Sequence, residues 1–430
     1  MAIPSTIFAV SSGQPPAAIA VIRVSGQGAM SAATQLAGRL PPPREARMRT
    51  LRDRHGGILD RALVLIFPGP ATATGEDLVE LHCHGGRAVV AAVEAVLADL
   101  PDVRRAEPGE FTRRALAHGR IDLAEAEGLA DLLEAQTERQ RVAALGAVEG
   151  RVSARVRNWL DRATDMAARA EAMLDFAEED DVPVDAVSLD RLKAEMDVLA
   201  VEMLEEVERP PVDRLYDGLR IVLGGPPNSG KSTLLNLLCE REAAIVSPIA
   251  GTTRDRIEAT IVRGGVAYIL VDTAGLAAAT DDAIEAIGIG RAEEAIAAAD
   301  ILLWLADTPP PRDDAIWLHT RADLDGRTIL PSGKNVAVSQ DDAGSIAAVW
   351  GLIASHAESL LPRADAIAWK RHQQAECRAA AVALSLAPAS DLLLLAEHLR
   401  VTRTCLSGVL GVSATETMLD ALFGRFCLGK

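Results

Sequence analysis

The chain lacks the features of a secreted or membrane-spanning protein. It has five scattered cysteines: Cys83, Cys239, Cys377, Cys405 and Cys427. Their odd number and the lack of a C-x-x-C pair argue for a reducing compartment and against a disulfide scaffold or zinc ribbon. No run of 18 uncharged apolar residues occurs, so we expect no transmembrane helix. No basic residue precedes Arg23, and prolines interrupt the apolar start. We therefore expect strands there instead of a signal peptide, and a cytoplasmic protein.

Basic residues are also in deficit. Lysine and arginine total 44 against 61 aspartates and glutamates, which gives a formal net charge of −17. Acidic proteins do not attract nucleic acid non-specifically. Any contact with RNA must therefore use a local basic surface, or a partner that supplies one.

The residue pattern divides the 430 residues into segments of different character. Residues 1–120 mix short apolar runs with glycine and proline turns, which predicts an α+β domain with strands over 18–24 and 61–67 and a helix over 88–100. Residues 123–208 are rich in Ala, Leu and Glu and carry an apolar stripe at helical spacing. Residues 367–425 are again helical in pattern.

The segment between the two helical regions alternates strand and helix. Expected strands cover 219–224, 257–263, 266–271, 301–306, 315–319 and 336–338, and expected helices cover 232–240 and 282–298. This alternation predicts a mainly parallel, doubly wound sheet with one antiparallel hairpin. We expect an α/β domain over 215–365, inserted into a helical domain of residues 121–214 and 366–430.

A phosphate-binding loop is predicted at residues 225–232, Gly-Pro-Pro-Asn-Ser-Gly-Lys-Ser. It matches G-x-x-x-x-G-K-S, follows an expected strand and opens an expected helix, which is the context that the motif requires. Lys231 can reach the β- and γ-phosphates, and the Ser232 hydroxyl can hold Mg²⁺.

Two further segments complete a nucleotide site. Asp272-Thr273-Ala274-Gly275 ends an expected strand, where Asp272 can hold Mg²⁺ through water and Gly275 can approach the γ-phosphate. Between this segment and the phosphate loop lies Gly251-Thr252-Thr253-Arg254-Asp255, in which a threonine hydroxyl can complete the Mg²⁺ shell. Taken alone it is also compatible with an ordinary turn, but its place between the other two favours a switch loop.

Guanine is expected to be read by Thr320-Arg321-Ala322-Asp323, in which Asp323 can accept two hydrogen bonds from the base. Many GTPases have Asn-Lys where this chain has Thr-Arg. Loss of one hydrogen bond costs about 1 kcal/mol, so we expect weakened guanine binding. Ser339, after the strand at 336–338, is expected in the last base-contacting loop. The segment between Trp304 and Trp317 is too short for a helix between its two strands.

These motifs predict binding and hydrolysis of GTP. The residues expected to contact the nucleotide are Asn228, Ser229, Gly230, Lys231, Ser232, Thr233, Ser247, Pro248, Ile249, Ala250, Gly251, Thr252, Thr253, Asp272, Thr273, Ala274, Gly275, Asp323 and Ser339. Leu276 stands where many GTPases carry a water-positioning Gln. Glu285 is a candidate for that role, although a solvated charge on a helix face explains it equally well.

Motifs along the whole chain resemble those of the MnmE (TrmE) family of tRNA uridine-modification GTPases. They are Arg23-Val24-Ser25-Gly26, Thr74-Gly75-Glu76-Asp77, Glu80-Leu81-His82-Cys83-His84-Gly85-Gly86, Pro108-Gly109-Glu110-Phe111-Thr112, Gly119-Arg120-Ile121-Asp122-Leu123 and Phe426-Cys427-Leu428-Gly429-Lys430. The resemblance implies a multidomain fold: an α+β domain for folate binding and dimerisation over 1–120, an all-α domain, and an inserted Ras-like P-loop GTPase domain.

The resemblance also implies a reaction and partners. Family members act as homodimers that form a heterotetramer with MnmG, a flavin (FAD) protein that uses NADH. Together they add an aminomethyl or carboxymethylaminomethyl group to C5 of the wobble uridine of certain tRNAs. The one-carbon unit comes from 5,10-methylenetetrahydrofolate or 5-formyltetrahydrofolate. The family's folate contacts fall here on Arg23, Glu80, Arg120 and Lys430, a carboxylate for the pterin and cations for the glutamate tail.

Ion sites and catalytic residues are implied in the same way. The family's GTPase is activated by K⁺, whose ligands match Asn228, Ser247, Ile249 and Thr252. The Mg²⁺ ligands match Ser232 and Thr253. The family's water-positioning glutamate matches Glu285, and Cys427 matches a cysteine implicated in the modification. We expect no metal site at His82-Cys83-His84, because neighbouring residues in a strand face opposite sides.

A non-enzymatic GTP switch in ribosome assembly or signalling is the alternative. It accounts for the nucleotide motifs but leaves Glu80, Arg120 and the terminal Cys-Leu-Gly-Lys without a role.

Overall fold

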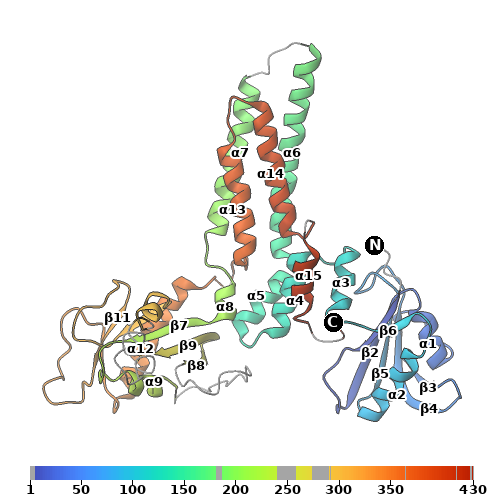
Figure 1. Ribbon diagram of the computed structural model, residues 1–430, viewed down its shortest axis with the longest axis horizontal. Coiled ribbons are helices and arrows are strands. Elements are labelled where there is room, and N and C mark those ends of the chain that lie inside the picture. The colour runs from blue at the N-terminus through green and yellow to red at the C-terminus, as the bar shows by residue number, and fades with distance from the viewer. Residues whose placement is uncertain are drawn as a thin grey trace. The chain divides into compact units, whose positions relative to one another are not determined.

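The computed structural model describes residues 5–180, 186–239, 258–273, 290, 292–363, 365–412, 414–426 and 429. The chain divides into two compact units. The first comprises Met1–Ala130, Ala147–Arg162 and Arg403–Lys430, and the second comprises Asp131–Gly146 and Ala163–Thr402. Each contains a six-stranded sheet and helices (Figure 1).

The sheet of the first unit has the strand order β3-β4-β5-β2-β1-β6. Its strands are β1 (Thr6–Val10), β2 (Ile19–Ser25), β3 (Arg47–Arg52), β4 (Ile58–Phe67), β5 (Leu78–His84) and β6 (Val103–Arg105). All pair antiparallel except β1 with β6. The helices are α1 (Ala29–Ala37), α2 (Arg87–Ala98) and α3 (Glu110–Ala117). The expected α+β arrangement of residues 1–120 is thus confirmed.

The two faces of this sheet differ in cover. Helices α1 and α2 pack on one face (Figure 1), where Ile22, Val24 and Leu81 are fully buried. On the opposite face, Phe111 of α3 covers only the region around Ile7 and Leu78. The rest of that face carries exposed or half-buried apolar side chains: Ile19, Val21, Met48, Leu63 and Leu65.

Among the described residues, further helices form the segments predicted to be helical on either side of the second sheet in the sequence. They are α4 (Leu123–Glu134), α5 (Glu138–Val148), α6 (Arg151–Asp180), α7 (Ala186–Val207), α13 (Arg371–Leu386), α14 (Leu392–Val409) and α15 (Glu416–Phe423). The apolar stripe predicted on α7 is buried at Leu192, Met196, Leu199 and Met203, and α7 lies beside α13 (Figure 1). None of the described helices is long and apolar enough to cross a membrane.

The second sheet has the order β12-β11-β10-β7-β9-β8. Its strands are β7 (Leu219–Gly224), β8 (Glu258–Arg263), β9 (Val266–Asp272), β10 (Ile301–Trp304), β11 (Ile316–Thr320) and β12 (Val336–Val338), and the accompanying helices are α8 (Asp213–Asp217), α9 (Lys231–Cys239) and α12 (Ala343–Leu360). All strands run parallel except β8, which forms the predicted hairpin with β9. Of the helix expected over 282–298, residues 290 and 292–297 are described as helical.

The connection from β7 leads to β8 and β9 on one side of it, whereas the connection from the adjacent β10 leads to β11 on the other side, so the strand order reverses between β7 and β10. In open α/β sheets, ligands bind at such a switch point, outside the carboxyl ends of the strands. The loop after β7 is the predicted phosphate-binding loop.

Candidate functional site

The phosphate loop connects the end of β7 to the start of α9 at Lys231. Its bends need left-handed backbone conformations: φ is 61° at Asn228 and 96° at Gly230. Glycine adopts such angles without steric cost, and asparagine tolerates them better than most residues. The sequence context predicted for this motif, a strand before it and a helix after it, is confirmed.

Lys231 lies inside this loop and is almost fully buried. Its Nζ donates to the carbonyl oxygens of Gly225 at 2.8 Å and Pro226 at 2.9 Å. Burial lowers the pKa of Lys231, and the nearby Asp272 carboxylate only partly opposes this. A phosphate beside the ammonium group would favour its charged form.

A hydroxyl and a carboxylate meet beside the loop. Ser232 Oγ donates to Asp272 Oδ2 at 2.6 Å. The next residue after Asp272, Thr273, donates through Oγ1 to the carbonyl oxygen of Leu223 at 2.8 Å, which fixes the end of β9 against β7. Hard oxygen ligands on two neighbouring elements are the donor set that Mg²⁺ prefers. Ser232 and Asp272 therefore fit a magnesium ion, and Ser232 was predicted for that role.

The loop predicted to read guanine contacts the phosphate loop directly. Thr320 Oγ1 donates to the carbonyl oxygen of Ser229 at 2.9 Å, and Arg321 Nη2 donates to the carbonyl oxygen of Asn228. Asp323 follows on the same loop and is exposed. The structure thus brings this loop beside the phosphate loop, and its Thr-Arg pair makes contacts that the sequence did not predict.

The segment predicted to make the last base contact lies next along the same sheet edge. The amide of Ala322 donates to the carbonyl oxygen of Val338 at 3.1 Å, so Ser339 directly follows the strand that contacts the Asp323 loop. Ser345 fixes this segment, because its Oγ accepts from the Ser339 amide at 3.2 Å.

Several predicted site residues lie outside the described residues. They are Ser247, Pro248, Ile249, Ala250, Gly251, Thr252, Thr253, Ala274, Gly275, Glu285, Cys427 and Lys430. Their roles stay predictions.

In the first unit, two of the predicted folate-contacting arginines line one cavity of about 380 Å³. They are Arg23 of β2 and Arg120, and the wall includes Thr74, Phe111 and Leu129. The third predicted residue, Glu80, faces Arg23 across the β2–β5 pair. Arg23 Nε donates to Glu80 Oε1 at 2.9 Å. The structure therefore brings three of the four predicted residues together.

Glu80 is held in its charged form. Burial would raise the pKa of Glu80, but hydrogen bonds and charge from His82 and Arg23 outweigh this and lower it. His82 Nε2 lies 3.1 Å from Glu80 Oε2. The carboxylate is therefore available as a charged acceptor at neutral pH.

The neighbouring residues of the His-Cys-His run face different surroundings. Cys83 is buried in the core, and this burial raises the pKa of its thiol to about 12. His84 Nδ1 lies 2.7 Å from Asp60 Oδ1. Among the described residues, no cluster of three His, Cys, Asp or Glu side chains could hold a metal ion.

The terminal motif reaches the first sheet through Gly429. Ser11 Oγ donates to the Gly429 carbonyl oxygen at 2.7 Å. Gly429 has a φ of +92°, and a Cβ there would lie 2.2 Å from the carbonyl oxygen of Val10. Only glycine fits this position.

Comparison with known proteins identifies the family. The family model described as "GTP-binding protein TrmE N-terminus" matches residues 6–120, and that described as "MnmE helical domain" matches residues 123–427. The tRNA modification GTPase MnmE of Erythrobacter litoralis is 51% identical over 99% of this chain and 100% of its own. Those of Rhizorhabdus wittichii and Sphingopyxis alaskensis are each 50% identical, covering 99% and 95% of this chain and 96% and 100% of their own.

The chain belongs to the MnmE family of tRNA modification GTPases. It is therefore a GTP hydrolase that acts in tRNA modification. This agrees with the first interpretation of the sequence and not with the non-enzymatic switch. The two family models together cover the N-terminal motifs, the helical segments and the phosphate loop in one chain.

One buried group beside the MnmE N-terminal cavity was missed by the sequence interpretation. Arg114 of α3 is 1% exposed and pairs with Glu76 at 3.0 Å and Glu110 at 2.9 Å. Glu76 accepts from Ser25 Oγ at 2.9 Å. Ser25 Oγ lies 2.7 Å from Thr74 Oγ1, and Thr74 lines the cavity. The Glu76 and Glu110 blocks were recognised as family motifs. The i,i+4 spacing of Glu110 and Arg114 on one helix could have indicated their pair, but nothing in the sequence indicated that Glu76 joins them.

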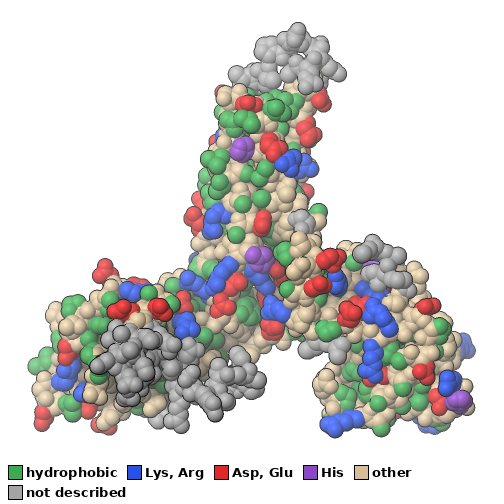
Figure 2. Space-filling model, viewed as in Figure 1, with side chains coloured by type: hydrophobic (Ala, Val, Ile, Leu, Met, Phe, Trp, Pro, Cys, Tyr) green, Lys and Arg blue, Asp and Glu red, His purple; other side chains and the backbone are tan. Residues whose placement is uncertain are grey.

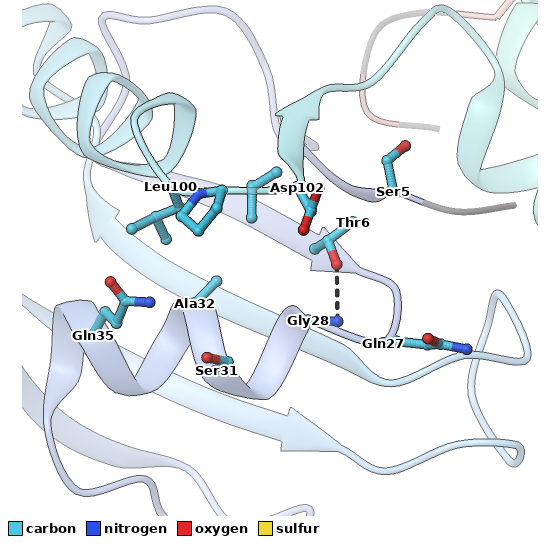
Figure 3. A pocket seen from close by; sticks show the side chains of 11 residues that line it. Ser5, Thr6, Gln27, Gly28, Ser31, Ala32, Gln35, Leu100 and Asp102 are labelled. Atoms are coloured by element: carbon cyan, nitrogen blue, oxygen red, sulfur yellow. Dashed lines mark hydrogen bonds between the residues drawn. The ribbon is translucent and has the colours of Figure 1, made fainter.

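A second, polar cavity of about 300 Å³ lies between α1 and the segment before β6 (Figure 3). Ser31 and Gln35 of α1 and Asp102 line it. The Gly28 amide donates to Thr6 Oγ1 at 2.9 Å at its edge. None of the residues predicted for the MnmE reaction lines this cavity.

Proposed function

We propose that this GTPase works with an MnmG-type flavin protein to modify C5 of the wobble uridine of certain tRNAs. The one-carbon unit would come from a tetrahydrofolate derivative bound in the Arg23–Arg120 cavity. The observation that carries this proposal is the convergence of Arg23 and Arg120 at one cavity, with Glu80 hydrogen-bonded to Arg23, in a tRNA modification GTPase. The division into residues 1–120, 121–214 with 366–430, and a Ras-like domain over 215–365 belongs to the same proposal, as does action in the cytoplasm.

Each side chain around the cavity has a proposed task. The charged Glu80 accepts hydrogen bonds from the donor edge of the pterin. Arg120, with Lys430, pairs with the glutamate carboxylates. Phe111 and Leu129 provide an apolar surface for the ring, since small-molecule sites combine apolar walls with a few placed polar groups.

In the GTPase site, Lys231 would bind the β- and γ-phosphates and Ser232 would ligate Mg²⁺, with Asp272 nearby. The metal ion neutralises charge that develops on the transferred phosphoryl group. Thr253 would complete the shell, and Glu285 would orient the attacking water. We propose that K⁺ binds at Asn228, with oxygens from Ser247, Ile249 and Thr252.

Two features support the proposed assembly. The half-open face of the first sheet, with Ile19, Val21 and Met48, offers apolar surface for a second copy in a homodimer. The face drawn in Figure 2 carries basic and acidic side chains interspersed along the helices, and the net charge is −17. A partner that supplies basic surface, such as the MnmG protein in a heterotetramer, would then complete the tRNA-binding surface.

Folate binding is tested with the full-length chain and 5-formyltetrahydrofolate in calorimetry. We expect Arg120→Met to weaken binding at least tenfold, because a hydrogen bond to a charged group contributes about 1.5–3 kcal/mol. Arg54→Met is the control, since Arg54 is exposed in the β3–β4 turn. Equal affinities in the two variants would contradict the assignment of the cavity.

The modification itself is tested by nucleoside analysis of tRNA from a deletion strain. An unmodified wobble uridine is expected, and restoration requires the intact chain. Unchanged tRNA in the deletion strain would eliminate the proposed reaction.

The ion assignment has its own test. Asn228→Ala should abolish stimulation of GTP hydrolysis by K⁺, measured against Na⁺, while nucleotide affinity stays nearly unchanged. Stimulation that persists in the variant would refute the K⁺ site.

A further inference from the structure

The flank of the second sheet next to the base-reading loop is built without a helix. The segment between Trp304 of β10 and Ile316 of β11 is fully described and contains none, as the sequence predicted. It carries Pro309-Pro310-Pro311 and, just after β10, Asp307. The side chain of Asp307 is 64% exposed.

Asp307 nevertheless has three well-formed contacts. Arg327 donates to the Asp307 carboxylate through both terminal nitrogens: Nη1 lies 3.0 Å from Oδ2, and Nη2 lies 3.0 Å from Oδ1. Lys334 Nζ donates to Oδ1 at 2.7 Å, and the Lys334 side chain is 2% exposed. These hydrogen bonds hold the pKa of Asp307 well below its usual range.

Arg327 also closes the loop that carries Asp323. Its Nε donates to the carbonyl oxygen of Thr320 at 3.1 Å. Its own carbonyl oxygen lies 2.8 Å from Nε2 of the buried His319. The Arg327 guanidinium therefore joins the start of the 320–327 loop to Asp307, just after β10. The backbone carbonyl of Arg327 holds the other end of the loop to His319 of β11.

The loop is consequently held from two sides. Thr320 and Arg321 join it to the phosphate loop, and Arg327 with Asp307 joins it to the flank. An exposed ion pair alone contributes little to stability. Its bidentate geometry, however, gives orientation as well as energy. What the contact supplies here is a fixed position for the loop between Thr320 and Arg327.

We propose that Arg327 and Asp307 are positioning residues for guanine recognition, which hold the Asp323 loop in place on a flank that has no helix. The proposal rests on the proposed role of Asp323. Neither residue is among those predicted to contact the nucleotide. Without them, the loop must be ordered when the base binds, and this ordering cost reduces affinity for guanine in particular.

The test compares GDP and ADP binding to full-length variants by equilibrium dialysis in Mg²⁺. Arg327→Met should weaken GDP binding roughly tenfold, the effect of ordering one or two side chains at binding, and leave the weaker ADP binding unchanged. Arg327→Lys keeps one contact to Asp307 and should recover part of the selectivity. Arg400→Met is the matched control, because Arg400 makes a similar bidentate pair with Glu397 on α14.

Asp307→Asn completes a double-mutant cycle with Arg327→Met. If the two residues act as one unit, the double variant should lose no more GDP affinity than Arg327→Met alone. An equal loss of GDP and ADP affinity, or unchanged GDP affinity, would overturn the positioning role. A wild-type chain that binds ADP as tightly as GDP would instead refute guanine reading by Asp323, and with it the basis of this proposal.

Discussion

Replacing Arg114 by Met tests how strongly the buried ion network supports the N-terminal cavity. The arginine is 1% exposed, and its partners Glu76 and Glu110 are 12% and 10% exposed. Methionine fills similar volume but removes the cation that pairs with Glu76, while Glu110 loses one of its two arginine partners and keeps Arg104. Removing one partner of a buried ion pair costs about 3–5 kcal/mol, so we expect a loss of this size in the local free energy of unfolding.

The preceding residue provides the control. Arg113 also pairs with two acidic side chains, Glu416 and Asp420, but these are 72% and 64% exposed. Exposed pairs contribute about 0–1 kcal/mol. Arg113→Met should therefore change local stability by no more than about 1 kcal/mol, although its position in α3 is adjacent.

The assay is native-state hydrogen exchange by mass spectrometry on the full-length chain. Peptides covering 72–77 and 110–117 report the opening of this network. A factor of ten in exchange corresponds to about 1.4 kcal/mol, so Arg114→Met should speed exchange by roughly two to three and a half orders of magnitude, and Arg113→Met by less than one. Similar exchange rates in the two variants would refute the assumption that the burial of an ion pair, and not the pairing itself, determines how much stability its removal costs.

Three further outcomes follow from the geometry. Burial would raise the pKa of Glu110, but hydrogen bonds from Arg104, the Glu107 amide and Arg114 lower it. The lowered pKa of Glu110 therefore contributes stability that is present at neutral pH and is lost as the pH falls below 4.5, the ordinary pKa of a glutamate. Acid unfolding of the wild type, compared with Glu110→Gln, checks this. Thr320→Asn should restore one base contact and raise GDP affinity roughly fivefold, without changing ADP affinity in dialysis. An unchanged GDP affinity would exclude the missing asparagine contact as the cause of weak guanine binding. Ser232→Ala should remove the Mg²⁺ dependence of GTP retention on filters, and full Mg²⁺ dependence would count against the assigned ligand.

Local patterns predicted the second sheet well. The strand before residues 225–232 and the helix after them were expected from apolar runs and one motif, and both formed as expected. These elements are specified by residues close in sequence. The Arg23–Glu80 contact is different, since it depends on the pairing register of β2 with β5. Family resemblance supplied the two residues, but local pattern could not have paired them.

Most of the contacts that sequence interpretation missed join distant segments. Arg114 meets Glu76 across 38 residues, and Arg327 meets Asp307 across 20. Charged residues are common in loops and on helices, so neither pair stands out by composition. Only the folded backbone shows which of many possible partners lies within reach.

The contact between Ser11 and Gly429 has a consequence for how the protein is made. The two residues are 418 positions apart, so at about 5–20 residues per second the ribosome needs roughly 20–80 s to pass from one to the other. During that interval the first sheet lacks the hydrogen bond from Ser11 to Gly429. A chain released before Gly429 is synthesised would keep its β1 and β2 segments but would not provide the carbonyl oxygen that Ser11 Oγ contacts in the structure.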